Sequence, residues 1–500
     1  MGRGVLELLG KNRQYDLVNL VQGNSMNSEL QQRLEALSQL VSGELQEDAQ
    51  AGFWAKFGLS GNPFPPSGIA DASEENPPLR DDVTKSILRF IIQSYKSRST
   101  QSLILRGDYG TGKTHTLRFI EHTVNSLMGL GDQTARAIYV ERPRIEAHEL
   151  NRTILKSLGL DTVRKYIWFA IKGQIAQEIA NDSERFQELK TSLTTPKRPL
   201  KSAVPPPMLI QDVPQTMSAS LSQVFDVTKL EDHRHFLLRF DSAKWNRELL
   251  RPFIIQCLLT VVGENFSSEL AGIFVALLLS RDESTFTSWE NLTGLIRSKA
   301  TASLRAPEFL DFLVKILNIN GIAYLYLLLD EFEEVPQGFL LTPRQRQDYL
   351  YTMREVFDRI REGVAIVMAI TPSAFDVLNE LATPFADRQS NIVDLDAISV
   401  QDAVRLAEFF LSRKREGEAL ESNIYPLSEE LLEYTIENFP TNAQRTPRSL
   451  IQFLYQLFEH AENENVAEIG ELVVKDVLDQ FSASKITQRK NQSSGRRNAF

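Results

Sequence analysis

The sequence predicts a doubly wound α/β fold, in which helices cover both faces of a parallel β-sheet. The first observation is a set of near-continuous apolar runs at 103–105, 324–329 and 364–370, since strands buried on both faces have this composition. The second is that segments with helical spacing separate these runs, as crossovers between parallel strands require. The third is a glycine-rich turn that follows the first run and leads into a helical segment. Two further strands are expected at 135–141 and 391–395.

The glycine-rich turn has the spacing of a phosphate-binding P-loop, with the sequence GDYGTGKT at residues 107–114. Its glycines permit positive φ angles and leave room for backbone N–H groups to surround phosphate oxygens. The positive end of the following helix faces the same anion, Lys113 reaches the β and γ phosphates, and the Thr114 hydroxyl is a ligand for Mg²⁺. We therefore expect a bound nucleoside triphosphate, with contacts from Gly107, Asp108, Tyr109, Gly110, Thr111, Gly112, Lys113, Thr114 and His115.

Two acidic residues follow the apolar run at 324–329 and complete such a site. Asp330 ends the expected strand, where it would hold Mg²⁺ together with Thr114, directly or through water. Glu331, one residue later, is placed to polarise the water that attacks the γ-phosphate. Glu333 and Glu334 follow at once and are alternatives for that role, although the strand register favours Glu331.

Three polar residues elsewhere are candidates for positions around the γ-phosphate. Thr371 ends the next expected strand, where it would hold the attacking water or, alternatively, serve as a turn residue. Arg448 opens a helix in the segment TPRSL, and its guanidinium would report which nucleotide is bound. Arg388 precedes the last expected strand and is either an arginine finger for a neighbouring subunit or an ordinary surface residue.

In this order, GDYGTGKTH, LLLDE, Thr371, Arg388 and TPRSL resemble the motifs of an AAA+ ATPase over residues 60–480. The segment Asn-Pro-Phe at 62–64 and TPRSL are similar to origin-recognition initiators and to related transposition or secretion ATPases. GDYGTGKTH with its following leucine also resembles the ATP-binding proteins of BREX-type phage-defence systems. The resemblance implies an ATPase that needs ATP and Mg²⁺, assembles as a homo-oligomer, and acts on DNA or a DNA-bound partner in a prokaryotic defence or mobile-element system.

The chain divides into an ATPase core with additions at both ends and one insertion. Residues 1–50 are a polar extension with one amphipathic helical stripe, which docks on the protein's own body or on a partner. A proline-rich linker and a helical subdomain at 194–316 are inserted into the core. We expect the AAA+ core at 51–193 and 317–398, a helical lid at 399–480 and a basic disordered tail at 481–500.

Composition excludes several other classes of protein. The single cysteine, Cys257, rules out an intramolecular disulfide and fits a reducing cytoplasm. The longest apolar run, at 270–279, has ten residues, whereas a helix that crosses a bilayer needs about 20. The net charge of −10 gives no general attraction to nucleic acid, so DNA contact requires a local patch. The tail is one such patch, with Lys485, Arg489, Lys490, Arg496 and Arg497.

Two alternatives to a DNA-directed ATPase remain open at the level of sequence. One is a signalling switch of the STAND type, in which nucleotide exchange gates an effector protein and hydrolysis is slow. The other is a scaffold that binds nucleotide merely to fold.

Overall fold

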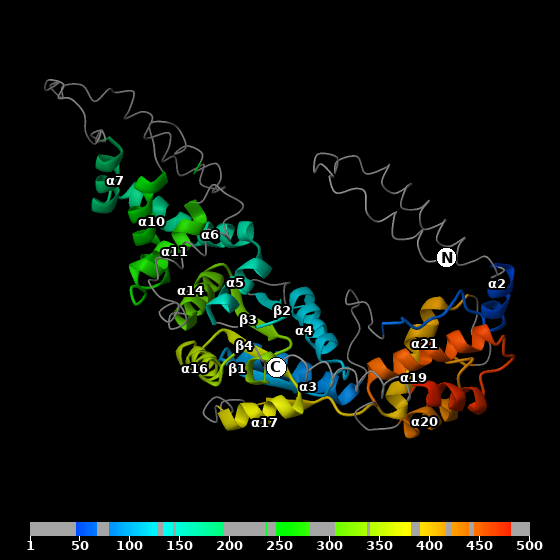
Figure 1. Ribbon diagram of the computed structural model, residues 1–500. Helices are drawn as coiled ribbons and strands as arrows, with labels where there is room; N and C mark the ends of the chain where they lie inside the picture. Colours follow the sequence, from blue (N-terminus) through cyan, green and yellow to red (C-terminus); the bar gives the residue numbers. More distant parts are fainter. Residues whose placement is uncertain are drawn as a thin grey trace, which may run out of the picture. The chain divides into compact units, whose positions relative to one another are not determined.

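The computed structural model describes two compact units of the chain, shown together in Figure 1. The P-loop unit comprises Gly68–Arg405 and Phe439–Leu450, and the helical unit comprises Met1–Ser67, Leu406–Asn438 and Ile451–Phe500. The structure describes residues 47–67, 80–127, 134–143, 147–194, 237, 247–279, 306–337, 341–381, 391–416, 422–439 and 445–481.

The P-loop unit is built on a five-stranded, all-parallel sheet with the order β2-β3-β4-β1-β5. The strand that precedes the P-loop, β1, therefore does not pair with the acidic strand, β3, because β4 lies between them. The carboxyl ends of these strands share one edge of the sheet, which is where the candidate site lies. The strands are β1 (Gln101–Arg106), β2 (Thr134–Val140), β3 (Ile322–Leu329), β4 (Val364–Ile370) and β5 (Asn391–Asp394).

Helices cover both faces of this sheet, because alternate residues of each central strand belong to two separate apolar clusters. Leu103 and Leu105 of β1 face the cluster that includes α3 (Asp81–Ser97) and α4 (Lys113–Leu127). Ile104, between them, faces the opposite cluster. Strand β4 is buried along its whole length, as its uninterrupted apolar sequence predicts. The predicted parallel, doubly covered α/β fold is confirmed.

On the second face, helices pack in more than one layer. The first layer contacts the sheet through α5 (Ala147–Leu158) and α14 (Ala306–Ile319), and α16 (Pro343–Arg359) packs against these two helices. Beyond it, α10 (Arg247–Val262) and α11 (Ser268–Leu279) lie against each other and α6, in the same apolar cluster as the sheet. The remaining helices of the unit are α6 (Leu160–Ala180), α7 (Glu184–Thr194), α15 (Glu334–Gln337) and α17 (Pro372–Leu381).

The helical unit has an aromatic core. It contains α2 (Glu47–Lys56), α20 (Glu429–Glu437), most of α19 (Val400–Lys414) and α21 (Pro447–Asn463), and a helix at 471–481. Phe64 lies 5.6 Å from Phe410 and 5.4 Å from Phe458 between ring centroids, and it is 2% exposed. The segment at 57–64 takes part in this core, because Phe57 and Phe64 at its two ends are both buried.

Several expectations fall on residues outside the described ranges: the amphipathic stripe of the first 50 residues, most of the linker, Arg388, and the basic tail. The domain boundaries given above remain predictions. Residues 47–67 belong with the helical unit, and 439–450 belong with the P-loop unit.

Candidate functional site

The P-loop connects the end of β1 to the start of α4, and its backbone requires glycine at three positions. Gly110 and Gly112 have φ angles of +84° and +100°, which side chains with a Cβ rarely adopt. Gly107 is needed for a different reason: a Cβ there would lie 2.5 Å from the Thr111 hydroxyl and 2.9 Å from Leu395. The Thr111 hydroxyl donates to the carbonyl oxygen of Asp108 at 2.8 Å, which closes the loop.

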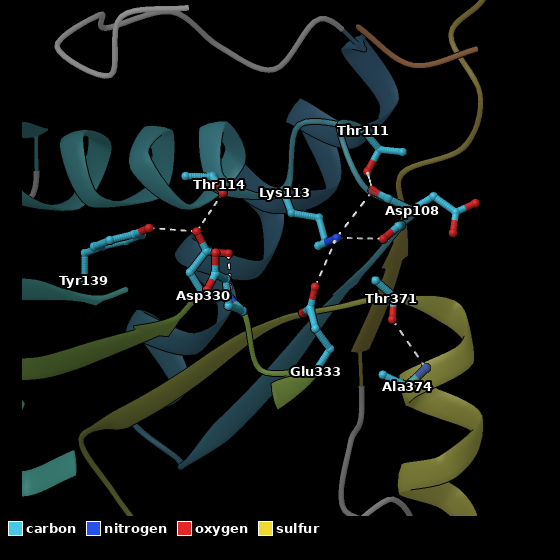
Figure 2. Close-up of polar contacts among 11 residues, drawn as sticks. Asp108, Thr111, Lys113, Thr114, Tyr139, Asp330, Glu333, Thr371 and Ala374 are labelled. Carbon is cyan, nitrogen blue, oxygen red and sulfur yellow. Dashed lines mark hydrogen bonds and ion pairs between the residues drawn. The ribbon is translucent and has the colours of Figure 1, made fainter. Parts of the chain in front are cut away.

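Lys113 is 7% exposed and points back into this loop. Its Nζ donates to the carbonyl oxygens of Gly107 at 2.8 Å and Asp108 at 3.3 Å, and lies 3.8 Å from Glu333 Oε1 (Figure 2). Burial lowers the pKa of Lys113 below its usual range, while the negative charge of Glu333 opposes that shift. The positive charge of Lys113 thus has a negatively charged partner inside the protein.

Asp330 lies directly after β3, and two hydroxyl groups converge on it. Thr114 Oγ1 and the Tyr139 hydroxyl donate to the same carboxylate oxygen, Oδ2, at 2.6 and 2.7 Å (Figure 2). The other oxygen, Oδ1, accepts a 2.9 Å hydrogen bond from the backbone N–H of Glu331. The ring of Tyr139 is stacked by Arg118 of α4, whose guanidinium carbon lies 3.5 Å from its centroid. Burial and the bond to Asp330 raise the Tyr139 pKa far above its usual range, so the hydroxyl remains a donor.

This donor set suits Mg²⁺. The ion prefers one or two protein oxygens, with water and substrate phosphates as its other ligands. The Thr114 hydroxyl and the Asp330 carboxylate, 2.6 Å apart, supply such oxygens beside the P-loop. No group of three His, Cys, Asp or Glu side chains in the described part of the chain is arranged to hold a metal ion. An ion at this site would therefore depend on nucleotide phosphates and water for its remaining ligands.

Glu331 points away from the lysine. Its side chain is 42% exposed, and Oε2 accepts a 2.7 Å hydrogen bond from Nε of Arg142, just beyond β2. The backbone of Glu331 has a φ of +50°, a left-handed conformation that is uncommon for a residue other than glycine. Such local strain is found most often at functional sites. In this conformation Arg142, and not the P-loop, is the partner of the expected water-activating carboxylate.

Glu333, two residues later, occupies the position beside Lys113. It is 7% exposed, and its Oε2 has no hydrogen-bond partner among the described residues. Burial raises the pKa of Glu333, with smaller contributions from the charges of Asp330 and Glu331, and Lys113 opposes the shift.

Thr371 lies at the end of β4, between β1 and β3, and is 3% exposed. Its hydroxyl accepts a 3.4 Å hydrogen bond from the Ala374 N–H at the start of α17, so it caps that helix (Figure 2). The structure shows this capping contact. The first predicted role of Thr371, holding the attacking water, remains a prediction.

Arg448 lies at the outer side of the P-loop. Its backbone N–H donates to the Gly110 carbonyl at 3.3 Å, and its side chain is exposed. A Cβ added at Gly110 would lie 3.0 Å from the Cβ of Arg448 and from Oγ1 of Thr446. The first turn of α21 is thus held against the phosphate-binding loop, which brings a second cation close to Lys113.

The structure therefore brings together the P-loop residues, Asp330 and Arg448, and places Thr371 at the neighbouring strand end. Arg388 lies outside the described residues. Sequence reasoning did not single out Tyr139 or Arg142. Their position at the carboxyl end of β2 was the signal that would have found them, because that strand lies beside the acidic strand.

Comparison with known proteins yields only a loose likeness. No protein-family model matches the chain, and no curated protein matches it significantly. Two solved structures of the Aeropyrum pernix ORC2 protein, an ADP form and a form with ADPNP and ADP, are similar to it. Each is 12% identical, with 82% of this chain and 71% of that chain covered and a TM-score of 0.41. No described helix is both long enough and apolar enough to cross a bilayer.

Proposed function

We propose that this chain is an ATPase of the AAA+ type that binds ATP with Mg²⁺. The observation that carries the proposal is the joining of the two halves of a nucleotide site. Thr114 at the start of α4 is bonded to Asp330 at the end of β3, although 216 positions separate them in sequence. A glycine-rich turn that served only to connect a strand to a helix would not require the Asp330 carboxylate as a partner for Thr114.

Each residue has a separate task in the proposed reaction. The loop at 107–115 surrounds the phosphates with N–H groups, and Lys113 bonds to the β and γ phosphates. Thr114 and Asp330 hold Mg²⁺, which when bound neutralises part of the phosphate charge. Glu331 removes a proton from the attacking water, and Thr371 orients that water. Arg448 and Arg388 bond to the γ-phosphoryl oxygens as negative charge develops there.

The direct test is to titrate the purified protein with ATP and ADP, and to follow phosphate release with and without Mg²⁺. We expect saturable binding of both nucleotides and hydrolysis only with the metal. Absence of binding by the folded protein would refute the proposal.

A second function, a nucleotide-gated switch that controls an effector, is favoured by one observation. The bond between Glu331 and Arg142 holds the expected base away from Lys113, so hydrolysis requires that this pair first separate. A switch would be purified with tightly bound ADP and would hydrolyse ATP very slowly. A DNA-directed motor would show steady turnover that DNA increases.

We also propose that the protein is a cytoplasmic homo-oligomer in which Arg388 acts on the neighbouring site. A finger of this kind typically raises the rate by ~10³–10⁵. Arg388→Ala should therefore lose turnover and keep binding. Mixing it with Lys113→Ala should partly restore turnover, because one subunit then offers an intact pocket and the other an intact finger. A mixture that stays inactive would argue against a finger in trans.

DNA or a DNA-bound protein is the proposed target, in a defence or mobile-element system. Support comes from the basic residues at 485–497 of an otherwise acidic chain. Deleting 485–500 should weaken DNA binding and flatten its salt dependence, while ATPase activity without DNA stays unchanged. If the full chain and the shortened variant show the same salt dependence of DNA binding, the tail does not contact DNA.

A further inference from the structure

The carboxylates that follow β3 differ sharply in their surroundings. The side chains of Glu331 and Glu334 are 42% and 47% exposed and lie near Arg142, whereas that of Glu333 is 8% exposed. Glu333 is directed at the P-loop lysine, as Figure 2 shows. A carboxylate is seldom buried unless a partner compensates its charge.

That compensation is incomplete in the structure. Glu333 Oε1 lies 3.8 Å from Lys113 Nζ, which is an ion-pair distance and longer than a hydrogen bond. Its Oε2 is buried and accepts no hydrogen bond from any described residue. Leaving such an oxygen unpaired costs free energy, so a group kept in this state is a candidate for a role in function.

The lysine, in turn, is engaged by partners within the protein. It donates to two P-loop carbonyls and pairs with Glu333, all inside the loop that would surround phosphates. A phosphate that binds to Lys113 must therefore replace some of these contacts of its Nζ atom. Of these, only Glu333 is negatively charged, so it alone would repel the phosphate strongly.

We propose that Glu333 is the counter-ion of Lys113 in the nucleotide-free protein and that phosphate displaces it, so that Glu333 sets the affinity for nucleotide. The inference rests on the proposed nucleotide site. Glu333 offsets the positive charge of the buried lysine across 3.8 Å. Once phosphates arrive, the same carboxylate is a like charge held within a few ångströms of them, and it weakens their binding.

The segment that carries Glu333 is short and tied by few backbone bonds. Glu334 and Val335 donate to the carbonyls of Glu331 and Phe332, and Gln337 donates to that of Glu333 itself, which together form α15. Displacement of the carboxylate by nucleotide should loosen these bonds. Binding would thereby be transmitted to the segment that also carries Glu331.

The experiment compares ADP affinity of the full chain with that of Glu333→Gln, which keeps the shape and removes the charge. ADP excludes any effect of slowed hydrolysis. We expect Glu333→Gln to bind ADP about tenfold more tightly, because a repulsion across a few ångströms of protein has been removed. The matched control is Glu334→Gln, an exposed carboxylate one residue away, which should leave the affinity within about twofold.

A second measurement uses the unmodified protein and so does not depend on how the variant folds. Hydrogen exchange at the amides of Glu334, Val335 and Gln337 should become faster when ADP is added. Unchanged ADP affinity in a folded Glu333→Gln, or weaker binding, would overturn the inference. Unchanged affinity with hydrolysis lost would make Glu333 the water activator instead. If the parent protein binds no ADP, the proposed function itself fails, which is a different result.

Discussion

The two sides of the candidate site are built in different ways. On the P-loop side, the polar contacts of Lys113 and Thr111 with the loop are made to carbonyl groups within six residues of them. On the acidic side, each carboxylate is paired with a side chain from another element: Asp330 with Thr114 and Tyr139, Glu331 with Arg142, and Glu333 with Lys113.

This difference separates a rigid side from an adjustable one. The P-loop backbone is determined by glycines at 107, 110 and 112, and a change there requires the loop itself to deform. The acidic side consists of side-chain pairs, which rotation about side-chain bonds is able to separate, and one of its residues, Glu331, has a left-handed backbone. We infer that binding depends mostly on the first side, and that turnover depends mostly on the second.

The largest expected effect is on the P-loop side. Lys113→Ala removes the one ammonium group inside the loop, so nucleotide binding should be abolished. Isothermal titration with ADP measures this, and a thermal unfolding curve shows whether the variant is folded. Lys85→Ala, an exposed lysine on α3, is the control. An ADP affinity within about threefold of the parent would contradict the P-loop assignment. It would also contradict the inference that binding depends mostly on the P-loop side of the site.

The next effect is on the acidic side and should spare binding. Glu331→Gln keeps the shape and loses the base, so ATP should bind normally and turnover should fall about a hundredfold or more. Single-turnover phosphate release measures it. If Glu331→Gln hydrolyses ATP at the rate of the parent protein, Glu333 and Glu334 are the next candidates for the water activator. Glu334→Gln then serves as the comparison at an exposed carboxylate.

The same contrast explains what could be predicted from sequence. The strands were recognisable because β3 and β4 are buried on both faces and so carry unbroken apolar runs. The P-loop was recognisable because its function lies in backbone geometry, which glycine spacing reveals. Both are local properties of a continuous stretch of chain.

The acidic side was only partly predictable, because its partners come from distant positions. Nothing near Asp330 in sequence indicates that Tyr139, 191 positions earlier, donates to it. Register along an extended strand favoured Glu331 over Glu333. The left-handed backbone at Glu331 turns the chain, however, and places Glu333 beside the lysine.

Tyr139 offers a smaller effect that is specific to the metal. Tyr139→Phe removes one of two hydroxyls on Asp330 Oδ2, and loss of such a partner typically weakens metal binding about 10- to 100-fold. We expect the Mg²⁺ concentration needed for tight ATP binding to rise about tenfold. The affinity for ATP measured in EDTA, which removes Mg²⁺, should stay unchanged. Titrating Mg²⁺ at fixed ATP measures this without reference to hydrolysis.

The control for this change is Tyr326→Phe. Tyr326 is buried in β3 of the same sheet, but its hydroxyl donates to the Ile91 carbonyl, away from the site. It should cost about 1 kcal/mol of stability and leave the Mg²⁺ requirement unchanged. An equal shift in both variants would mean that Tyr139 acts through stability alone.

The smallest expected effect concerns Arg448. Its backbone is bonded to the P-loop, on the rigid side of the site, whereas its side chain is exposed and adjustable. Its backbone N–H bonds to Gly110, and this bond survives replacement by alanine, so Arg448→Ala removes the guanidinium and little else. The pKa of Lys113 is lowered first by burial, and the positive charge of Arg448 lowers it further, so both cations act on one small region. A triphosphate brings more negative charge near these two cations than a diphosphate does, so it should gain more from the Arg448 guanidinium. Because the side chain is exposed, we expect only about a three- to tenfold loss of ATP affinity, with a smaller loss for ADP.

Arg448→Lys keeps the charge and loses the planar fork, so its ATP affinity should fall between those of the parent protein and Arg448→Ala. Arg344→Ala, an exposed arginine on α16, is the control and should change neither affinity. Equal losses for ATP and ADP would mean that Arg448 attracts phosphate in general and does not distinguish the γ-phosphate.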